Sequence, residues 1–365
     1  MNQEELFYRI AITMLPKVGP VTARNLISYC GGTREVFETS TKALMKIPGV
    51  GAAMSKSILQ HDSFAPAEQE LAFIDKQNIK PIFYLDDDYP KRLQNVYDAP
   101  VLLYFRGDAT LNAARTVGIV GTRTPTPHGI ANCEALVEGL AKYNVQIISG
   151  LAHGIDGTSH RAAVAAGISN IGVVAHGLDH IYPAAHSHLA NSMIKNGGVL
   201  TEFPSNTTAD KERFPMRNRI IAAMSDALVV VETARKGGSM ITADMAFNYN
   251  KDIFAFPGRT QDKYSQGCNY LIKSQKAGLI ENAEDLAAQM MWDKIDSGKT
   301  VQTSMFVELS ELERKVLSEL QTKDTGIDEL SYIIQLTPAE MASVLLEMEF
   351  KGLIKSIPGK RYILA

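Results

Sequence analysis

The chain has 365 residues, of which 45% are hydrophobic and 21% are charged, and this composition excludes collagenous, disordered and miniprotein classes. Its length suits two or three globular domains. The 37 Lys and Arg residues are opposed by 40 Asp and Glu residues, which gives a formal net charge of −3, so bulk charge alone argues against a nucleic-acid partner.

Residues 1–65 are predicted to form a domain of short helices. Two breaks in the helical pattern, at 15–26 and 47–58, share an apolar residue, Pro, a glycine turn and a helix with small and basic residues. This is the helix-hairpin-helix pattern, in which glycines let backbone N–H groups at a helix N-terminus approach a DNA phosphate. The segment carries a net charge of only +2, so a SAM-like helical packing domain without DNA contact is the other interpretation.

Residues 66–295 alternate short apolar runs with helical stretches, which is typical of an α/β fold with a parallel sheet and helices wound on both faces. We predict an extended Rossmann-like, doubly wound core here. Its expected strands are Thr116–Val120, Gln146–Ser149, Asn170–Ala175, Gly198–Glu202, Ala227–Glu232 and Asp252–Phe256.

The end of the chain is predicted to be a separate small domain. The polar stretch 296–308 indicates a linker. Three amphipathic helices near 310–321, 327–335 and 338–350, followed by a β-hairpin, indicate a winged-helix domain over 309–365. From 296 onward there are 8 basic and 11 acidic residues, and the expected recognition helix carries glutamates, which face phosphates poorly. We therefore favour protein contact or self-association as the role of this domain.

Cysteine usage and hydropathy indicate a cytoplasmic protein. Cys30, Cys133 and Cys268 are far apart and form no Cys-x-x-Cys pair, which fits a reducing compartment and argues against a disulfide framework or a zinc ribbon. The first ten residues are acidic where a signal peptide needs a basic region, and no apolar run reaches the roughly 20 residues of a spanning helix. We expect no membrane contact.

Glycines, hydroxyls and arginines follow the expected strands. Ligands of open parallel sheets bind outside the carboxyl ends of the strands, and N–H groups at helix N-termini favour negative charge. The loops therefore predict a cradle for phosphate groups. The stretch 118–121 is not a Gly-x-Gly-x-x-Gly dinucleotide turn, and the cradle contains no Gly-x-x-x-x-Gly-Lys-Ser/Thr run.

Two arginines of the cradle, Arg217 and Arg219, are two residues apart and diverge by about 200° on a helix. We expect one of them to face the ligand and the other to pack or to form an ion pair with Glu202 or Asp226. Further basic residues in neighbouring loops of the same sheet edge favour a functional cluster over isolated ion pairs.

Six of the eight histidines fall within 153–188. They scatter over loops and helices with few adjacent carboxylates, which is not the spacing of a metal site. We expect His153 and His180 to touch a ligand, and we expect no metal or other cofactor. No catalytic triad, Cys-His pair or carboxylate pair is evident, and Asp156 and Asp179 are interpreted as helix-cap and turn acceptors.

A series of short motifs runs through the core in a fixed order. It comprises Ile119–Arg123, Ser149–Asp156, Gly177–Asp179 with Tyr182-Pro183, Phe214-Pro215 with Arg217–Ile221, Gly238-Ser239 with Ile241-Thr242, and Phe256–Gly258 with Gly267, Asn269 and Leu271-Ile272. This series resembles the DNA-processing protein A (DprA, or Smf) family. The resemblance covers nearly the whole chain, since family members often carry a helical N-terminal module, an extended Rossmann-like core and a winged-helix tail.

The resemblance implies a protein that binds single-stranded DNA, protects it and promotes loading of the RecA recombinase in natural transformation, without being an enzyme. It also implies a homodimer through the core. Family members often have a lysine where His180 stands, which predicts weaker or pH-dependent binding. The family resemblance and the predicted phosphate cradle together give the residues that we expect to bind DNA. They are Gly121, Thr122, Arg123, Ser149, Gly150, His153, His180, Tyr182, Arg217, Asn218, Arg219, Lys236, Gly237, Gly238 and Ser239.

Two other functions stay open at this point. Rossmann-like nucleotide phosphoribohydrolases have a similar edge, with a Pro-Gly-Gly-x-Gly-Thr-type loop that residues 236–239 only partly resemble and a catalytic glutamate nearby. An interaction scaffold built on the acidic tail predicts no DNA binding. The aromatic residues Tyr182 and Phe214 are candidates for base stacking, and a core position is the other interpretation of both.

Overall fold

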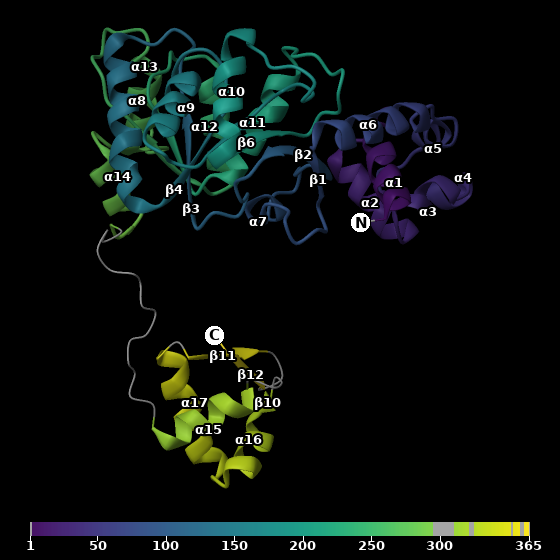
Figure 1. Ribbon diagram of the computed structural model, residues 1–365, viewed down its shortest axis with the longest axis vertical. Helices are drawn as coiled ribbons and strands as arrows, with labels where there is room; N and C mark the ends of the chain where they lie inside the picture. Colours follow the sequence, from purple (N-terminus) through teal and green to yellow (C-terminus); the bar gives the residue numbers. More distant parts are fainter. Residues whose placement is uncertain (1, 295–309, 321–324, 352, 358–360, 365) are drawn as a thin grey trace. The chain divides into compact units, whose positions relative to one another are not determined.

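Contacts in the computed structural model divide the chain into two units, Met1–Ile295 and Asp296–Ala365 (Figure 1). The structure describes residues 2–294, 310–320, 325–351, 353–357 and 361–364, so the expected linker over 296–308 lies outside the described residues. Among the described helices, none combines the length and the apolar character needed to cross a membrane.

Six helices open the first unit, where short helices were predicted. They are α1 (Gln3–Thr13), α2 (Pro20–Cys30), α3 (Thr33–Glu38), α4 (Thr41–Leu44), α5 (Ala52–Leu59) and α6 (Phe64–Gln77). The turns before α2 and α5 have the same shape, with φ of −86° and ψ of 175° and 174° at Gly19 and Gly51. The repeated sequence pattern therefore corresponds to a repeated turn, while its contact with phosphate stays a prediction.

The helical part and the α/β part share one hydrophobic core. Leu26 and Ile58 of the helices belong to the same buried cluster as Tyr104 of the sheet. The boundary expected at residue 65 falls inside α6, because Ala67 and Ile74 extend the buried side of that helix past this point and into the shared cluster.

Nine strands form one sheet in the order β1-β2-β6-β5-β4-β3-β7-β8-β9. Six of them match the expected strands to within two residues and pair in parallel: β3 (Arg115–Val120), β4 (Val145–Ser149), β5 (Asn170–Val173), β6 (Gly197–Thr201), β7 (Ala227–Val230) and β8 (Asp252–Ala255). At one edge the sheet extends beyond the six expected strands, since β1 (Lys80–Phe83) pairs antiparallel with β2 (Leu102–Gly107) and β2 pairs antiparallel with β6. A short strand, β9 (Gly278–Leu279), completes the other edge.

Helices lie on both faces of this sheet (Figure 1). Helices α11 (Arg213–Met224), α12 (Gly238–Asn248) and α13 (Gln266–Lys273) pack on one face, and α8 (Pro127–Leu140), α9 (Ile155–Ala165) and α14 (Ala283–Gln289) pack on the other. The short helices α7 (Lys91–Gln94) and α10 (Ser187–Met193) complete the unit. Side chains of β7 alternate between the two clusters, Leu228 and Val230 on one face and Val229 on the other, as the period of two in a strand requires. The predicted α/β, doubly wound class is confirmed.

The second unit contains the expected three helices and a hairpin. They are α15 (Glu311–Leu320), α16 (Ile327–Ile334) and α17 (Pro338–Phe350), with β11 (Ile354–Ile357) and β12 (Arg361–Leu364), and a short strand β10 (Thr325–Gly326) pairs with β12. Thr337 and Glu340 form a reciprocal capping box at the start of α17. Val316, Leu330, Met341 and Leu345 belong to a core that this unit forms by itself.

Candidate functional site

Two adjoining hollows lie where the strand order reverses. Strand β3 pairs with β4 on one side and with β7 on the other, so the chain winds outward from β3 in both directions, and open α/β sheets bind ligands at this point. Gly121 and Ser239 line the first hollow, and His153 and Tyr182 line the second. Both hollows share Arg123, Ala152, Phe214 and Arg217. We treat them as one site and call it the switch-point site.

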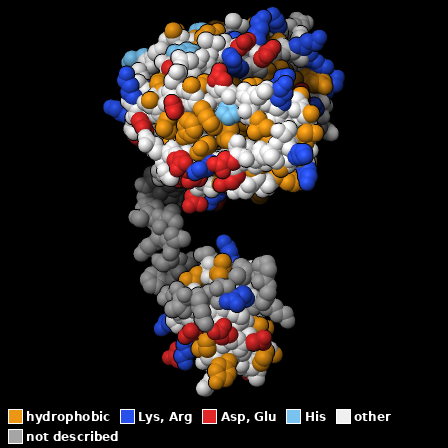
Figure 2. Space-filling view, turned by 90° about the vertical axis from the view of Figure 1, so that its right-hand side faces the viewer, with side chains coloured by type: hydrophobic (Ala, Val, Ile, Leu, Met, Phe, Trp, Pro, Cys, Tyr) orange, Lys and Arg blue, Asp and Glu red, His pale blue; other side chains and the backbone are white. Residues whose placement is uncertain are grey.

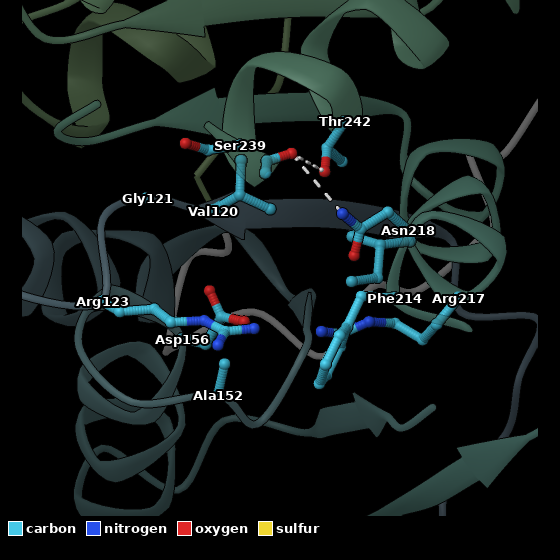
Figure 3. A pocket seen from close by; sticks show the side chains of 12 residues that line it. Val120, Gly121, Arg123, Ala152, Asp156, Phe214, Arg217, Asn218, Ser239 and Thr242 are labelled. Atoms are coloured by element: carbon cyan, nitrogen blue, oxygen red, sulfur yellow. Dashed lines mark hydrogen bonds between the residues drawn. The ribbon is translucent and has the colours of Figure 1, made fainter. Parts of the chain in front are cut away.

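Two arginines meet at one aromatic ring in this site. Arg123 is exposed on the loop after β3, whereas Arg217 of α11 is only 4% exposed. Their Cζ atoms lie 4.9 Å and 5.9 Å from the centre of the Phe214 ring. Figure 3 shows the two guanidinium groups reaching toward the same space from opposite sides. An arginine stacked on a ring keeps its N–H donors available for phosphate oxygens.

Arg217 is a buried charge whose hydrogen-bonding capacity is only partly used. Its Nη1 donates to the Val173 carbonyl oxygen at 2.7 Å, but its Nε has no hydrogen-bond partner among the described residues. Burial lowers the pKa of Arg217 to about 10, so the group stays charged at neutral pH. Burial also raises the pKa of the neighbouring Asp156 carboxyl, an effect that Arg217 opposes. A buried guanidinium with an unused donor favours an anionic ligand.

Helix α12 begins at the first hollow. Gly237 is its N-cap residue and supplies no side-chain hydrogen bond, and the nearest atom to a Cβ built there would lie 3.9 Å away. Asn218 Nδ2 donates to the Gly238 carbonyl oxygen at 3.5 Å, and Ser239 Oγ donates to Thr233 Oγ1 at 2.7 Å. The open helix start, with its N–H groups and its dipole, is suited to an anion.

The turn between β5 and α10 forms a wall of the second hollow. His176 accepts a hydrogen bond from the Tyr182 backbone N–H at 3.1 Å and donates through Nδ1 to the Gly177 carbonyl oxygen at 2.8 Å. Burial lowers the pKa of His176, and its ring stacks on His180 at 4.6 Å. His180 in turn contacts Asp179 Oδ2 at 3.0 Å. These contacts hold the turn in a shape that leaves the Tyr182 side chain 47% exposed at the hollow.

Comparison with known proteins identifies the family. The model of the family described as DNA recombination-mediator protein A matches residues 80–291, and the model of the DprA winged helix domain matches residues 307–360. The chain belongs to the DprA family. DNA processing protein DprA of Bacillus subtilis is 39% identical over 259 residues, which cover 71% of this chain and 85% of that protein.

Two solved DprA structures resemble the chain. The X-ray structure of DNA processing protein A from Streptococcus pneumoniae has a TM-score of 0.68 at 31% identity, over 78% of this chain and 97% of that one. DNA processing protein A from Helicobacter pylori, whose structure is described for its single-stranded DNA binding mode, has a TM-score of 0.53 at 29% identity, over 58% and 95% of the two chains. The DprA resemblance inferred from the motifs is confirmed.

The switch-point site of this DprA-family chain brings together nine of the residues expected from the sequence. They are Gly121, Arg123, Gly150, His153, Tyr182, Arg217, Asn218, Gly238 and Ser239. Thr122, His180, Lys236 and Gly237 lie in the same loops without lining either hollow. Within the described part of the chain, His, Cys, Asp and Glu side chains form no group of three that could hold a metal ion.

Two expected residues have other roles. Arg219 is 7% exposed and forms a buried ion pair with Glu202, because residues two apart on a helix face different directions. Ser149 is fully buried, and its Oγ donates to the Ile119 carbonyl oxygen at 2.6 Å, which ties the ends of β3 and β4 together. Both residues support the site from behind and do not line it.

Sequence reasoning misjudged Asp156 and left Phe214 undecided. Asp156 was expected to cap α9, but the N-cap of that helix is Gly154. Hydrogen bonds from the Ala152 and Gly150 backbones nevertheless reach the Asp156 carboxyl and oppose the rise in its pKa that burial causes, and Asp156 also lines the first hollow at 8% exposure. Phe214 is half-buried and lines both hollows. The sequence did contain a signal for Asp156 as a site residue. It is a carboxylate in the first turn of a helix that follows a glycine loop, and a neighbouring loop carries arginines.

Proposed function

We propose that this DprA-family chain binds single-stranded DNA along the switch-point site, protects it and promotes loading of the RecA recombinase in natural transformation, without turning over a substrate. The observation that carries the proposal is the meeting of Arg123 and Arg217 at the Phe214 ring. The DprA of H. pylori, described for its single-stranded DNA binding, supports the same ligand.

The chemistry of the site suits a single strand of any sequence. Arg123 and the open start of α12 offer donors to phosphate oxygens, which are the same for every nucleotide. Phe214 and Tyr182 offer ring faces on which bases stack, and such stacking contributes about 1–3 kcal/mol per base. A duplex keeps its bases paired and stacked inside, so it cannot use these rings.

A nucleotide phosphoribohydrolase is less well supported. The two hollows of the site have cavity volumes of only about 80 Å³ and about 20 Å³, whereas pockets that enclose a small-molecule ligand typically measure roughly 300–1,000 Å³. A space of this size suits a phosphate group of a strand that lies across the surface. It does not suit a nucleoside monophosphate held for cleavage.

The substitution Arg123→Ala tests the proposal. We expect affinity for an oligothymidylate to fall about 10- to 100-fold, because the variant lacks one charge-assisted hydrogen-bonding group. The slope of log affinity against log salt should flatten by about 0.7 for each phosphate that Arg123 no longer neutralises. Fluorescence anisotropy across a salt series measures both quantities.

Lys195→Ala is the matched control, since Lys195 is also an exposed cation of the first unit and should change neither quantity. A folded Arg123→Ala variant with unchanged affinity and slope would remove this residue from the site. Release of free base from nucleoside monophosphates by the unaltered protein would instead support the hydrolase.

The finer parts of the proposal concern partners. We propose a homodimer through the Rossmann-like core and RecA as the recombinase partner. Sedimentation at several concentrations tests the dimer, and the rate of RecA filament formation on a single strand, with and without this protein, tests the loading. A monomer at all concentrations, or an unchanged filament rate, argues against the respective part.

A further inference from the structure

A third hollow lies beside the switch-point site and has no role in the function proposed so far. Its cavity volume is about 650 Å³, within the roughly 300–1,000 Å³ typical of ligand pockets. It is lined by residues 126–128 at the start of α8, by Glu232 after β7 and by residues of the loop 258–265. We call it the α8 hollow.

A single loop separates the α8 hollow from the switch-point site. Gly121 and Arg123 line the switch-point site, and Thr126, at the end of the same loop, lines the α8 hollow. Thr124 Oγ1 and the Tyr264 hydroxyl form a hydrogen bond of 2.6 Å, which joins this loop to the loop 258–265. A strand that leaves Arg123 over this loop therefore meets Tyr264 next.

The lining of the α8 hollow offers both kinds of contact that a single strand needs. Tyr264 is a half-buried aromatic residue, and Lys263 Nζ lies 5.4 Å from the centre of its ring. Arg259 and Lys263 are exposed, and neither forms an ion pair with another described residue. Cations beside an aromatic ring are typical of sequence-independent single-strand binding.

The carboxylates of the hollow leave these cations available. Glu232 accepts hydrogen bonds from the Thr126 backbone N–H at 2.9 Å and from its hydroxyl at 2.5 Å, so both of its oxygens are engaged at the start of α8. Asp262 is the other carboxylate on the lining, and the two exposed cations outnumber it.

We propose that the α8 hollow is a second section of the single-strand track, in which a base stacks on Tyr264 and the adjoining phosphates contact Arg259 and Lys263. The strand runs from the switch-point site across the loop 121–126 into this hollow. The inference rests on the proposed function, because it concerns the continuation of the same strand.

Affinity as a function of strand length tests the inference. The double variant Arg259→Ala/Lys263→Ala and Tyr264→Ala are titrated with labelled oligothymidylates of increasing length. We expect near-normal affinity for the shortest strands that bind. For longer strands that fill both sections, the affinity of Tyr264→Ala should be about 5- to 100-fold below that of the unaltered protein.

Tyr264→Phe separates stacking from the hydrogen bond with Thr124, since it keeps the ring and removes the hydroxyl. Tyr264→Phe should retain most of the increase in affinity with oligonucleotide length, and Lys195→Ala should retain all of it. Equal length dependence in the unaltered protein, the double variant and Tyr264→Ala would overturn the inference while leaving the switch-point site intact. Failure of the unaltered protein to bind any single strand would instead refute the proposed function.

Discussion

Gly150 is the residue that lets Arg217 reach the switch-point site. A Cβ built on Gly150 would lie 1.8 Å from Arg217 Nη1 and 2.5 Å from Asp156 Oδ2. Since Arg217 Nη1 is also the atom that donates to the Val173 carbonyl oxygen, any side chain at position 150 must push the guanidinium group away from its acceptor. A side chain at position 150 therefore fits only if Arg217 and Asp156 shift from their places.

We expect Gly150→Ala to lower single-strand affinity by about tenfold or more, because Arg217 is displaced from both its place and its acceptor. Fluorescence anisotropy measures the affinity, and circular dichroism verifies that the variant is folded at the temperature used. Lys195→Ala is again the control, since Lys195 is exposed and lines neither hollow. Full affinity in Gly150→Ala would show that Arg217 does not bind the strand.

For individual residues, the sequence predicts where the functional side chains cluster better than it predicts the role of each one. The spacing of Arg217 and Arg219 predicts that they diverge, but periodicity cannot tell which one faces the ligand. Arg219 forms an ion pair with the buried carboxylate of Glu202, which follows strand β6. Glu202 is one of the two partners expected from the sequence, and the choice between it and Asp226 depends on tertiary contacts that no local pattern contains.

Helix α6 reaches the switch-point site through two intervening loops. Glu70 of α6 is 3% exposed and accepts hydrogen bonds from both the backbone N–H and the hydroxyl of Ser205. The next residue, Asn206, donates its backbone N–H to Asp179 Oδ1 at 3.0 Å. Asp179 belongs to the turn that carries Tyr182. Helix α6 thus supports the wall of the second hollow from behind.

We expect Glu70→Ala to weaken single-strand binding several-fold, since it leaves the Ser205 backbone N–H without its acceptor and loosens the loop behind the turn. Glu70→Gln should restore most of the affinity, because the amide oxygen can accept the same two hydrogen bonds. Anisotropy titrations of the three proteins make the comparison. Equal affinity in Glu70→Ala and the unaltered protein would separate α6 from the DNA site.

Strands were predictable from the sequence where their apolar runs were long enough. The six central strands are buried on both faces and appear as continuous apolar runs, so the sequence predicts them well. Strand β1 spans only Lys80–Phe83 with Pro81 inside it, and β9 has two residues. Strands this short at a sheet edge carry too little pattern to be distinguished from loops.

For the whole molecule, the position of charge matters more than its sum. Figure 2 shows basic, acidic and apolar side chains interspersed over one face of the first unit. The net charge of −3 is therefore compatible with a DNA strand held at the carboxyl ends of the parallel β-strands, where Arg123, Arg217 and the start of α12 meet. DNA affinity confined to this site should depend strongly on salt and be low for duplex DNA.

The second unit provides the last test, because its surface argues against a role in duplex binding. It has its own buried core around Val316, Leu330 and Met341, so it is expected to fold when expressed alone. On α17, the helix that would enter a groove, Leu346 is 55% exposed and Phe350 is 84% exposed. From 296 onward there are 8 basic and 11 acidic residues, and a surface of this kind repels phosphates.

We therefore expect removal of residues 296–365 to change single-strand affinity by less than about twofold, and the isolated segment to show no duplex binding at physiological salt. Anisotropy with matched single- and double-stranded oligonucleotides measures both. The full chain at the same salt is the control. Duplex binding by the isolated segment would place part of the DNA site on the second unit, and so would a large drop in single-strand affinity in the shortened chain. Either result would argue against protein contact as the role of the exposed apolar side chains of α17.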